Sequence, residues 1–379
     1  MAKSATAQKK ATKKTTKKAT PKRKGAGKVS PKKRATQLQV MVEAREFLQQ
    51  KHGKGAVRMM NEVDSTIPGY ISTQSLALDK LVGNDGVPQS RMIEIYGPEG
   101  IGKSTISDHL IAQVQKLDGV AYLWDTENAR DHRYMDQVGI VRGRAIRVEA
   151  DTVEAGYAIA QDTIDWHLAH YPDRLGIWVW DTVAGTPTEA ELDPSKSNER
   201  FGPAKMIRGM CRVLTQSLKK SRWIFVVVNQ TYITQKGHFP VVKTYGGEGI
   251  PYYSSVRLEC GYRSPQWRTT TSKEAGEDPI GQTIIVKSSK NKTFPPLRSE
   301  KIYIRYGEGI DNVWTLYDTL CGAGMITQAG GWYELDWPEV AGKYPKWQSG
   351  YDGLKQLCSE NVDLWRDVIL GYQALEKRR

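Results

Sequence analysis

The sequence predicts an α/β fold in which a mostly parallel central sheet carries a phosphate-binding loop. The loop is residues 97–104, which read GxxxxGKS between an apolar run and an amphipathic pattern. Three later apolar runs are separated by helical patterns, as in a parallel sheet whose strands are buried on both faces. The strand, loop and helix order is the setting in which this motif binds nucleotide phosphates.

Residues 97–104 predict a site for ATP with Mg²⁺. Glycine lets consecutive backbone N–H groups turn onto the phosphates, where a side chain would block the approach. We expect Lys103 to reach the β- and γ-phosphates and Ser104 to place its hydroxyl on Mg²⁺. The alternative, a glycine-rich turn with an incidental lysine, is weaker because a strand and a helix flank the motif. The residues expected along the nucleotide are Gly97, Pro98, Glu99, Gly100, Ile101, Gly102, Lys103, Ser104 and Thr105.

Apolar runs define the sheet around this loop. Residues 92–96 form the preceding strand, and the helix after the loop has one apolar stripe. The buried strands of the remaining sheet are expected at residues 120–124, 177–180 and 223–228. The apolar stripe consists of Ile106, Leu110, Ile111, Val114 and Leu117.

Polar residues follow the strands at their carboxyl ends, where ligands bind in open α/β sheets. Asp181 has the position of the carboxylate that holds Mg²⁺ through water, and Glu127 is the better candidate for orienting the attacking water. The Gln230 amide can bond the γ-phosphate or that water and move when the phosphate leaves. For all three, a polar residue that merely ends a strand is the alternative. The set expected to converge on the γ-phosphate is Asp125, Glu127, Asp181, Asn229 and Gln230.

Composition limits the class of protein. At 379 residues and 39% hydrophobic, the chain can bury a sizeable core. No apolar run approaches the roughly 20 residues of a membrane span, and the N-terminus lacks the apolar centre of a secretory signal. The four cysteines form no CxxC pair and the six histidines no HExxH, so neither zinc nor disulfides are indicated. We expect a cytoplasmic protein with no membrane partner.

The positive charge is concentrated at the N-terminus. Residues 1–34 hold fourteen Lys and Arg and no Asp or Glu, more than the whole chain's net charge of +13. This composition predicts a disordered basic tail over residues 1–35. Its functional interpretation is a non-specific arm on nucleic acid, since neutralising phosphates releases counterions. A solubilising end and a targeting segment are the alternatives.

A helix over residues 37–50 is expected after the tail, followed by a short strand at residues 56–60. These two elements cannot form a domain alone. Their apolar faces must therefore contact a core of their own or a neighbouring subunit.

Two stretches without periodicity, residues 187–202 and 231–249, are predicted to be functional loops. The second combines aromatic residues, including Phe239, with basic residues and glycines, a mixture that suits single-stranded nucleic acid. The helix that begins at Pro203 adds one basic face, which a solvated helix face explains equally well. That face consists of Lys205, Arg208 and Arg212.

Seven further motifs occur in a fixed order along residues 53–310. In this order they resemble the RecA family of homologous-recombination ATPases, over roughly residues 37–340. The resemblance implies an assembly helix and strand at 36–70, a RecA-like core at 71–310 and a small α+β C-terminal domain at 311–379. The motifs are Gly53-Lys54-Gly55, Ile71-Ser72-Thr73-Gln74-Ser75-Leu76-Ala77-Leu78-Asp79, Ile93-Glu94-Ile95-Tyr96-Gly97-Pro98-Glu99, Asn229-Gln230, Tyr245-Gly246-Gly247, Lys290-Asn291-Lys292 and Tyr306-Gly307-Glu308-Gly309-Ile310.

The resemblance implies roles for particular residues. Glu127 would be the catalytic glutamate, and Gln230 the γ-phosphate sensor that opens the second DNA-binding loop. Lys290 and Lys292 match a lysine pair that reaches the ATP of the adjacent subunit. The positions that meet adenine match Asp131 and Tyr134, and the DNA-contacting positions match Arg212, Gly246 and Gly247.

The implied function is a DNA-dependent ATPase that forms a helical filament on single-stranded DNA and exchanges strands with homologous duplex during recombination and repair. Its location would be the cytoplasm, at the nucleoid, or the host cytoplasm for a phage protein. Three alternatives share parts of the sequence pattern. They are a ring-shaped helicase of the same fold, a regulatory ATP-switched protein that does not bind DNA, and an architectural DNA-coating protein that uses ATP as an assembly switch.

The chain also departs from the bacterial pattern of this family. Lys205 stands where Arg is usual, which keeps the charge but loses a bidentate phosphate contact. Pro251 replaces a usual lysine beside the subunit interface, and the second loop is one residue short. Residues 375–379 are mostly basic where relatives often carry an acidic tail. These departures imply weaker autoinhibition of DNA binding.

Overall fold

A computed structural model of the chain describes residues 36–62, 67–83, 86–193, 195, 203–236, 239–266 and 279–378. The chain divides into two units, Met1–Asp64 and Ser65–Arg379, and each is described by itself. The expected basic tail, residues 1–35, lies outside the described residues. In the first expected loop, residues 187–202, residue 194 and residues 196–202 also lie outside the described residues.

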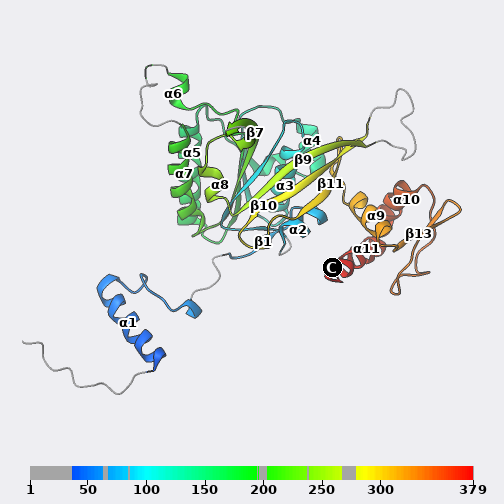
Figure 1. The fold of residues 1–379 in the computed structure, drawn as a ribbon, viewed down its shortest axis with the longest axis horizontal. Helices are drawn as coiled ribbons and strands as arrows, with labels where there is room; N and C mark the ends of the chain where they lie inside the picture. The colour runs from blue at the N-terminus through cyan, green and yellow to red at the C-terminus, as the bar shows by residue number, and fades with distance from the viewer. Residues whose placement is uncertain are drawn as a thin grey trace, which may run out of the picture. The chain divides into compact units, whose positions relative to one another are not determined.

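The first unit contains helix α1 (Gln37–His52) and a 3₁₀ turn η1 (Met60–Glu62) (Figure 1). A capping box at Thr36 starts the helix, and Gly53 ends it. The predicted helix is confirmed. The predicted strand at residues 56–60 is wrong, because a strand requires a paired backbone and no strand lies beside it within residues 36–62.

Helix α1 buries none of its side chains, although its sequence contains several large apolar residues. An isolated helix of this length is marginal in water, and most helical stability comes from packing of an apolar face. This unit therefore presents apolar side chains without a covering layer among its own described residues. On α1 itself the exposed ones are Leu38, Val40, Met41 and Phe47.

The second unit is built on a sheet of ten strands within its described residues, in the order β12-β11-β10-β9-β3-β7-β6-β4-β5 with β8 paired to β7. The strands from β9 to β5 in this order are parallel, and the other pairings are antiparallel. The bounds are β3 (Arg91–Gly97), β4 (Val120–Asp125), β5 (Ala145–Arg147), β6 (Leu175–Asp181), β7 (Arg222–Lys236), β8 (Phe239–Thr244), β9 (Val256–Gln266), β10 (Gly281–Asn291), β11 (Ser299–Arg305) and β12 (Gly309–Ile310).

Helices cover both faces of this sheet (Figure 1). In β7, Ile224 and Val226 join a cluster with the α3 side chains, whereas Phe225 and Val227 join a second cluster with α5 and α7. This alternation follows from the period of two in a strand. The helices and minor elements are β1 (Tyr70–Ile71), α2 (Leu76–Val82), β2 (Val87–Pro88), α3 (Lys103–Lys116), α4 (His132–Val138), η2 (Arg142–Arg144), α5 (Val153–His170), α6 (Glu189–Leu192), α7 (Pro203–Leu218) and α8 (Gly249–Tyr253).

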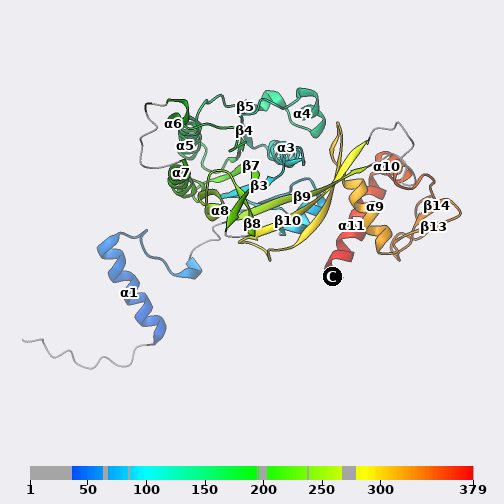
Figure 2. The same cartoon turned by 45° about the horizontal axis from the view of Figure 1, so that its top comes forward.

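A third hydrophobic cluster lies after residue 310 and is formed by separate elements, grouped in Figure 2. Trp337 and Trp347 are buried in it, as the sequence predicts, but Trp332 is 47% exposed, so that expectation is wrong. Trp332 begins β14 beside the turn of its hairpin with β13, where residues 328–331 are exposed as well. The elements are α9 (Asn312–Gly322), β13 (Ile326–Ala329), β14 (Trp332–Leu335), α10 (Gly350–Glu360) and α11 (Val362–Arg378).

The predicted α/β class with a mostly parallel sheet is confirmed, and each of the four expected strands is present. Among the described residues, no helix is both long and apolar enough to cross a bilayer. The prediction that Leu117 belongs to the apolar stripe of α3 is wrong, because Leu117 follows the last helical residue and is 50% exposed.

The two expected loops contain regular structure. In the first, Thr188 caps the short helix α6 through a capping box. In the second, β7 and β8 form an antiparallel hairpin in which Thr231 faces Thr244 and Ile233 faces Val242. These β-branched pairs favour an extended ribbon. The expectation of an irregular loop is therefore wrong for residues 189–192, 231–236 and 239–244, whereas residues 245–248 form a turn.

Candidate functional site

The phosphate loop connects β3 to α3, and its glycines have conformations that exclude side chains. Gly97 has φ +156°, and a Cβ there would collide with the carbonyl oxygen of Cys260. Gly102 has φ +97°, and a Cβ there would collide with Ile304. Because α3 begins at Lys103, the unpaired N–H groups of its first turn lie beside the loop, which is a favourable place for an anion.

A cavity of about 320 Å³ opens over this loop. It contains most of the residues predicted for nucleotide and metal binding. Five further residues line it to which the sequence interpretation gave no role at the nucleotide: Thr182, Gln282, Ile304, Tyr306 and Gly307. The predicted residues in its lining are Glu99, Gly100, Ile101, Gly102, Lys103, Ser104, Thr105, Glu127, Tyr134, Asp181 and Gln230.

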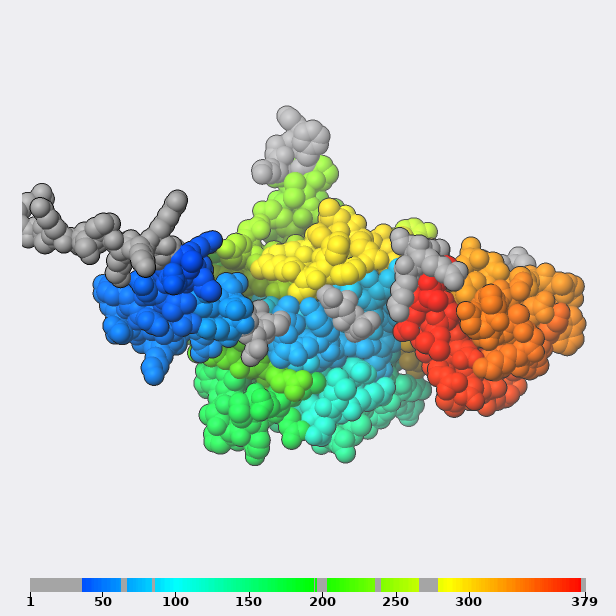
Figure 3. All heavy atoms as spheres, turned by 90° about the horizontal axis from the view of Figure 1, so that it is seen from below, coloured from blue at the N-terminus to red at the C-terminus, as the bar shows by residue number. Residues whose placement is uncertain are grey.

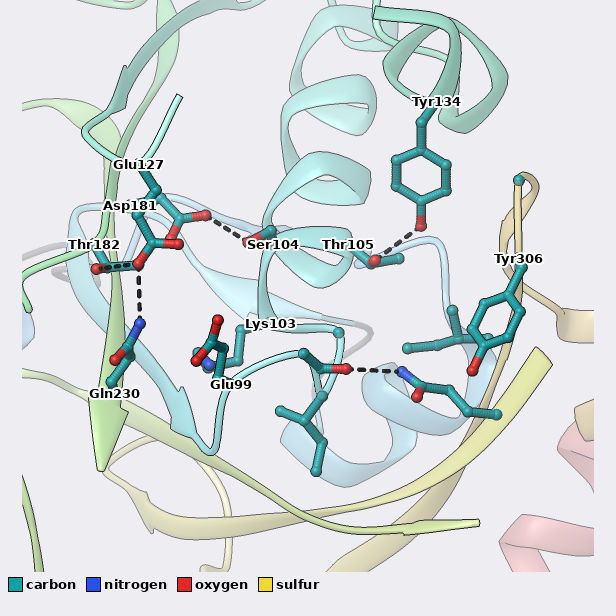
Figure 4. A pocket seen from close by; sticks show the side chains of 16 residues that line it. Glu99, Lys103, Ser104, Thr105, Glu127, Tyr134, Asp181, Thr182, Gln230 and Tyr306 are labelled. Atoms are coloured by element: carbon teal, nitrogen blue, oxygen red, sulfur yellow. Dashed lines mark hydrogen bonds between the residues drawn. The ribbon is translucent and has the colours of Figure 1, made fainter. Parts of the chain in front are cut away.

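The Ser104 hydroxyl donates a hydrogen bond of 2.7 Å to Oδ2 of Asp181 (Figure 4). One hydroxyl and one carboxylate fit Mg²⁺, which keeps several waters and takes its remaining ligands from substrate phosphates. Within the described residues no group of three or more His, Cys, Asp or Glu could hold a metal by itself. The donor set therefore fits a metal that arrives with a nucleotide.

Glu127 lies at the centre of a second group of contacts in the same cavity (Figure 4). Its Oε1 accepts hydrogen bonds from Oγ1 of Thr182 at 3.0 Å and from Nε2 of Gln230 at 2.9 Å. Thr182 directly follows Asp181, and a small polar residue after a strand-end aspartate was the signal that could have identified it. The carboxylate expected to orient water is thus held by the amide expected to sense the γ-phosphate.

The Lys103 ammonium donates to the carbonyl oxygen of Pro98 at 2.6 Å. Burial lowers the pKa of Lys103, because the cavity replaces part of its hydration shell. Gly97 and Pro98 do not line the cavity: Gly97 ends β3, and the Pro98 carbonyl holds the lysine. The bond to Pro98 is to a neutral carbonyl, so a phosphate group would give this ammonium an anionic partner.

Arg130 forms a buried ion cluster behind the cavity, which the sequence interpretation missed. Its guanidinium contacts Asp108 at 2.9 Å, Asp181 at 2.8 Å and Asp125 at 3.5 Å, and its side chain is only 7% exposed. Burial alone lowers the pKa of Arg130, but the three carboxylates outweigh this effect and raise it. Burial raises the pKa of Asp108 to about 6 and also raises that of Asp181, and in both cases Arg130 opposes the rise.

Two aromatic rings line the cavity on the side away from Glu127 and Asp181 (Figure 4). The Tyr134 hydroxyl hydrogen-bonds Oγ1 of Thr105 at 2.8 Å, and Tyr306 follows β11. Asp131, the other residue expected to meet adenine, caps α4 by accepting from the backbone N–H of Arg133 and is not part of the lining.

Other predicted residues lie away from this cavity. Asn229 and Asp125 do not converge on it: Asn229 is fully buried against Glu94, and Asp125 faces Arg130. The expectation for these two is wrong. Asn229 directly precedes Gln230 on β7 and therefore points to the opposite face of the sheet. Asp125 lies beside Asp181 in the register of β4 and β6, but the Arg130 guanidinium holds it outside the lining.

The predicted lysine pair also lies away from the cavity of its own chain. The Lys290 ammonium donates to the carbonyl oxygens of Pro251 and Tyr252 in α8, at 2.6 and 2.8 Å. Burial lowers the pKa of Lys290 to about 8, and the neighbouring charge of Lys292 adds to the effect. Neither lysine lines the nucleotide cavity.

The residues predicted to contact DNA gather around the start of α7. Its outward face exposes Lys205, Arg208 and Arg212, while the opposite face is buried. A Cβ on Gly247 would lie 2.6 Å from the Cβ of Ala204, so the glycine turn lies directly against this helix. Gly246 and Gly247 both have left-handed φ values, +80° and +71°. Phe239 begins β8, and its side chain is outside the described residues.

Comparisons with known proteins agree with this geometry. The family described as RecA N-terminal domain matches residues 39–311. Protein RecA of Lactobacillus johnsonii is 32% identical over 323 residues, which cover 85% of this chain and 84% of the relative. Protein RecA of Bacillus thuringiensis and that of Bacillus anthracis are each 31% identical, covering 85% of this chain and 88% of the relative.

Proposed function

The chain belongs to the RecA family, and on that premise we propose that it is a DNA-dependent ATPase that catalyses homologous pairing and strand exchange. One observation carries the proposal. Gln230 holds Glu127 in the nucleotide cavity, and the same strand β7 continues from Gln230 into the exposed hairpin with β8. A change at the γ-phosphate that moves Gln230 would therefore also move the hairpin, because both belong to one strand, and the hairpin surface suits DNA.

In the proposed reaction, phosphoryl transfer depends on positioning and charge stabilisation. ATP lies with its phosphates over residues 97–105, and Lys103 leaves the Pro98 carbonyl to meet them. Glu127 orients the attacking water and accepts its proton, while Gln230 and Thr182 fix the carboxylate. Ser104 and Asp181 would hold Mg²⁺, which supplies charge neutralisation at the β- and γ-phosphates. Tyr134 and Tyr306 offer rings to the base.

We propose that assembly completes this site. Lys290 and Lys292 lie outside the cavity of their own chain, and a neighbouring subunit would receive them beside its ATP. The uncovered apolar face of α1 would contact a neighbouring subunit as well. ATP binding between subunits then favours a helical filament, because each nucleotide is held from two sides.

The proposed DNA surface combines the basic face of α7 with the glycine turn and the hairpin. Tyr232 and Tyr245 form an exposed aromatic pair with ring centroids 4.9 Å apart, and Ile233 is 74% exposed. Aromatic stacking and basic side chains together suit single-stranded DNA. The hairpin stands out from the surface in Figure 3. We place this activity in the cytoplasm at the nucleoid.

The basic residues 1–34 would add a non-specific duplex contact. Deleting them should reduce the slope of log affinity for duplex against log salt, since fewer counterions are released. Fluorescence anisotropy with a labelled duplex at several salt concentrations measures this slope. An unchanged slope would show that the arm is not on DNA.

The proposed function is tested by ATP turnover of the purified chain with no DNA, with circular single-stranded DNA and with duplex, at one moderate salt. Strong stimulation by the single strand is expected, and electron microscopy then distinguishes a filament from a ring-shaped helicase. DNA binding without stimulation would contradict the proposal and favour an architectural protein in which ATP serves assembly.

A further inference from the structure

A row of polar side chains crosses the sheet beside the cavity, and apart from Lys290 at its end the reaction proposed above does not use it. It runs over four neighbouring strands, β7, β3, β9 and β10. Glu94 pairs with Arg257 in the register of β3 and β9, and Arg257 pairs with Lys290 in the register of β9 and β10. Asn229 on β7 completes the row. Both Glu94 and Asn229 are 0% exposed, and a buried carboxylate is costly unless every bond it needs is made.

Hydrogen bonds connect Asn229, Glu94 and Arg257 in this row, and Lys290 lies beside Arg257 in the strand register. Glu94 accepts from Nδ2 of Asn229 through Oε1 at 3.1 Å, and from Nε of Arg257 through Oε2 at 2.5 Å. Arg257 in turn stacks over the ring of Tyr96 at 4.4 Å. Lys290, the next residue across, is held by two carbonyls of α8. The row therefore extends from the centre of the sheet to the lysine that we propose reaches the adjacent subunit.

Asn229 connects the same row to both ends of the hairpin. Its Oδ1 accepts from the backbone N–H of Gln230 at 2.9 Å, and its Nδ2 also donates to the carbonyl oxygen of Tyr245 at 2.9 Å. Gln230 contacts Glu127, and Tyr245 directly precedes Gly246. One fully buried amide thus fixes the phosphate sensor, the start of the glycine turn and the buried carboxylate.

We infer that Asn229, Glu94 and Arg257 are positioning residues that couple the state of Gln230 to the glycine turn and to Lys290. The inference rests on the proposed function. When Gln230 changes partner after hydrolysis, Asn229 cannot move without either breaking a bond to a buried charge or moving Glu94 with it. Such a network would have two stable hydrogen-bonding arrangements and few between them. An element with two discrete arrangements can carry a change at the nucleotide to the glycine turn. Coupling energy, not proximity, is the evidence that decides it.

Two variants interrupt the row without changing its volume. Glu94→Gln leaves one acceptor oxygen facing two fixed donors, Asn229 and Arg257, so one bond must be lost. Arg257→Lys keeps the positive charge but removes the planar Nε–H that meets Glu94. Ser288→Ala is the matched control, because Ser288 is buried on β10 and its hydroxyl has no hydrogen-bond partner among the described residues.

The measurement is ATP turnover with and without single-stranded DNA, together with binding of a fluorescent ATP analogue and thermal melting. Both variants should keep basal turnover and analogue affinity within about twofold, while stimulation by DNA falls roughly fivefold or more. The double variant should be no worse than the single variants, since both interrupt one path. Ser288→Ala should match the unmodified chain.

The outcomes separate this inference from the proposed function. If the unmodified chain is not stimulated by DNA, the proposed function fails. If it is stimulated and both variants are stimulated equally, the coupling row is overturned. Should Glu94→Gln fail to fold, Arg257→Lys decides alone, because its side chain is 18% exposed and its charge is retained. Parallel loss of basal and stimulated turnover would also overturn the inference, since that result indicates general structural damage.

Discussion

Strand β7 has two halves that differ in burial and in their pairing partners. In residues 222–230 the apolar side chains are buried on both faces, with Ile224, Val226 and Val228 all 0% exposed. In residues 231–236 the strand pairs only with β8, and Ile233 is 74% exposed. The boundary is Gln230, which contacts Glu127. The inner half depends on packing for its stability, and the outer half leaves its side chains available for a partner.

This difference predicts that single substitutions in the inner half change stability and that substitutions in the outer half change binding. Side chains of the inner half are packed in the core, so shortening one leaves a void. Charged side chains near the cavity are paired, so removing one leaves a buried charge without its partner. Side chains of the hairpin have few partners to lose. The predictions below test that division.

The largest effect is expected at Glu127, the hydrogen-bond partner of the boundary residue Gln230. Glu127→Gln should lower ATP turnover by about 100-fold or more, because the amide cannot accept a proton from water. ATP and DNA binding should remain, and filaments should persist because turnover is blocked. Phosphate release, nucleotide binding and electron microscopy measure the three properties. Glu149→Gln, at an exposed carboxylate, is the control, and unaltered hydrolysis in Glu127→Gln would remove the residue from its role.

The ion cluster behind the cavity should show the largest effect on stability. Arg130→Leu should lower the free energy of unfolding by about 3–5 kcal/mol, because Asp108 and Asp181 lose the charge that offsets their burial. The double variant Arg130→Leu/Asp108→Leu should recover part of the loss. Urea unfolding curves measure both. Equal stability of Arg130→Leu and the unmodified chain would show that the cluster is hydrated in solution.

His109 makes stability depend on pH. Burial lowers its pKa to about 4 from 6.5, and its Nε2 accepts the backbone N–H of Ile310 at 2.9 Å. Between these values the unfolded chain binds the proton and the folded chain does not, so stability is complete above about pH 6.5 and falls towards pH 4. The loss is about 3 kcal/mol.

The variant His109→Gln isolates this contribution, because glutamine can accept the same hydrogen bond but does not titrate. Unfolding free energies at pH 7 and pH 4 should differ by about 3 kcal/mol less in the variant than in the unmodified chain. The same pH dependence in both proteins would assign the acid sensitivity to other groups.

The sequence predicted the inner part of the molecule well, because strong local signals specify it. The motif at residues 97–104, the apolar run of β7 and the carboxylate at the end of β6 each indicate their position without tertiary information. Within the cavity, Glu127 and Gln230 come together as expected, although their chemical roles stay predictions.

The missed features depend on contacts between segments distant in sequence. Arg130 has no motif, and its three carboxylates come from separate elements. The apolar run that Asn229 follows predicts a position at the γ-phosphate, but the direction of this side chain is set by the register of β7 with β3. The hairpin gives little sequence signal because most of its described side chains are exposed or only half-buried, so no apolar face creates a periodic pattern. The C-terminal domain boundary stays a prediction.

The smallest effect tests the two halves of β7 with one substitution. Ile224→Val should lower the free energy of unfolding by about 1 kcal/mol, because it removes a buried methyl group. Ile233→Val should change it by less than about 0.5 kcal/mol, because the side chain is already in solvent. Thermal melting of both variants without DNA measures the difference. Equal losses would mean that the hairpin is covered in solution before DNA binds, and the outer half of β7 would then be part of an assembly interface instead of an open DNA surface.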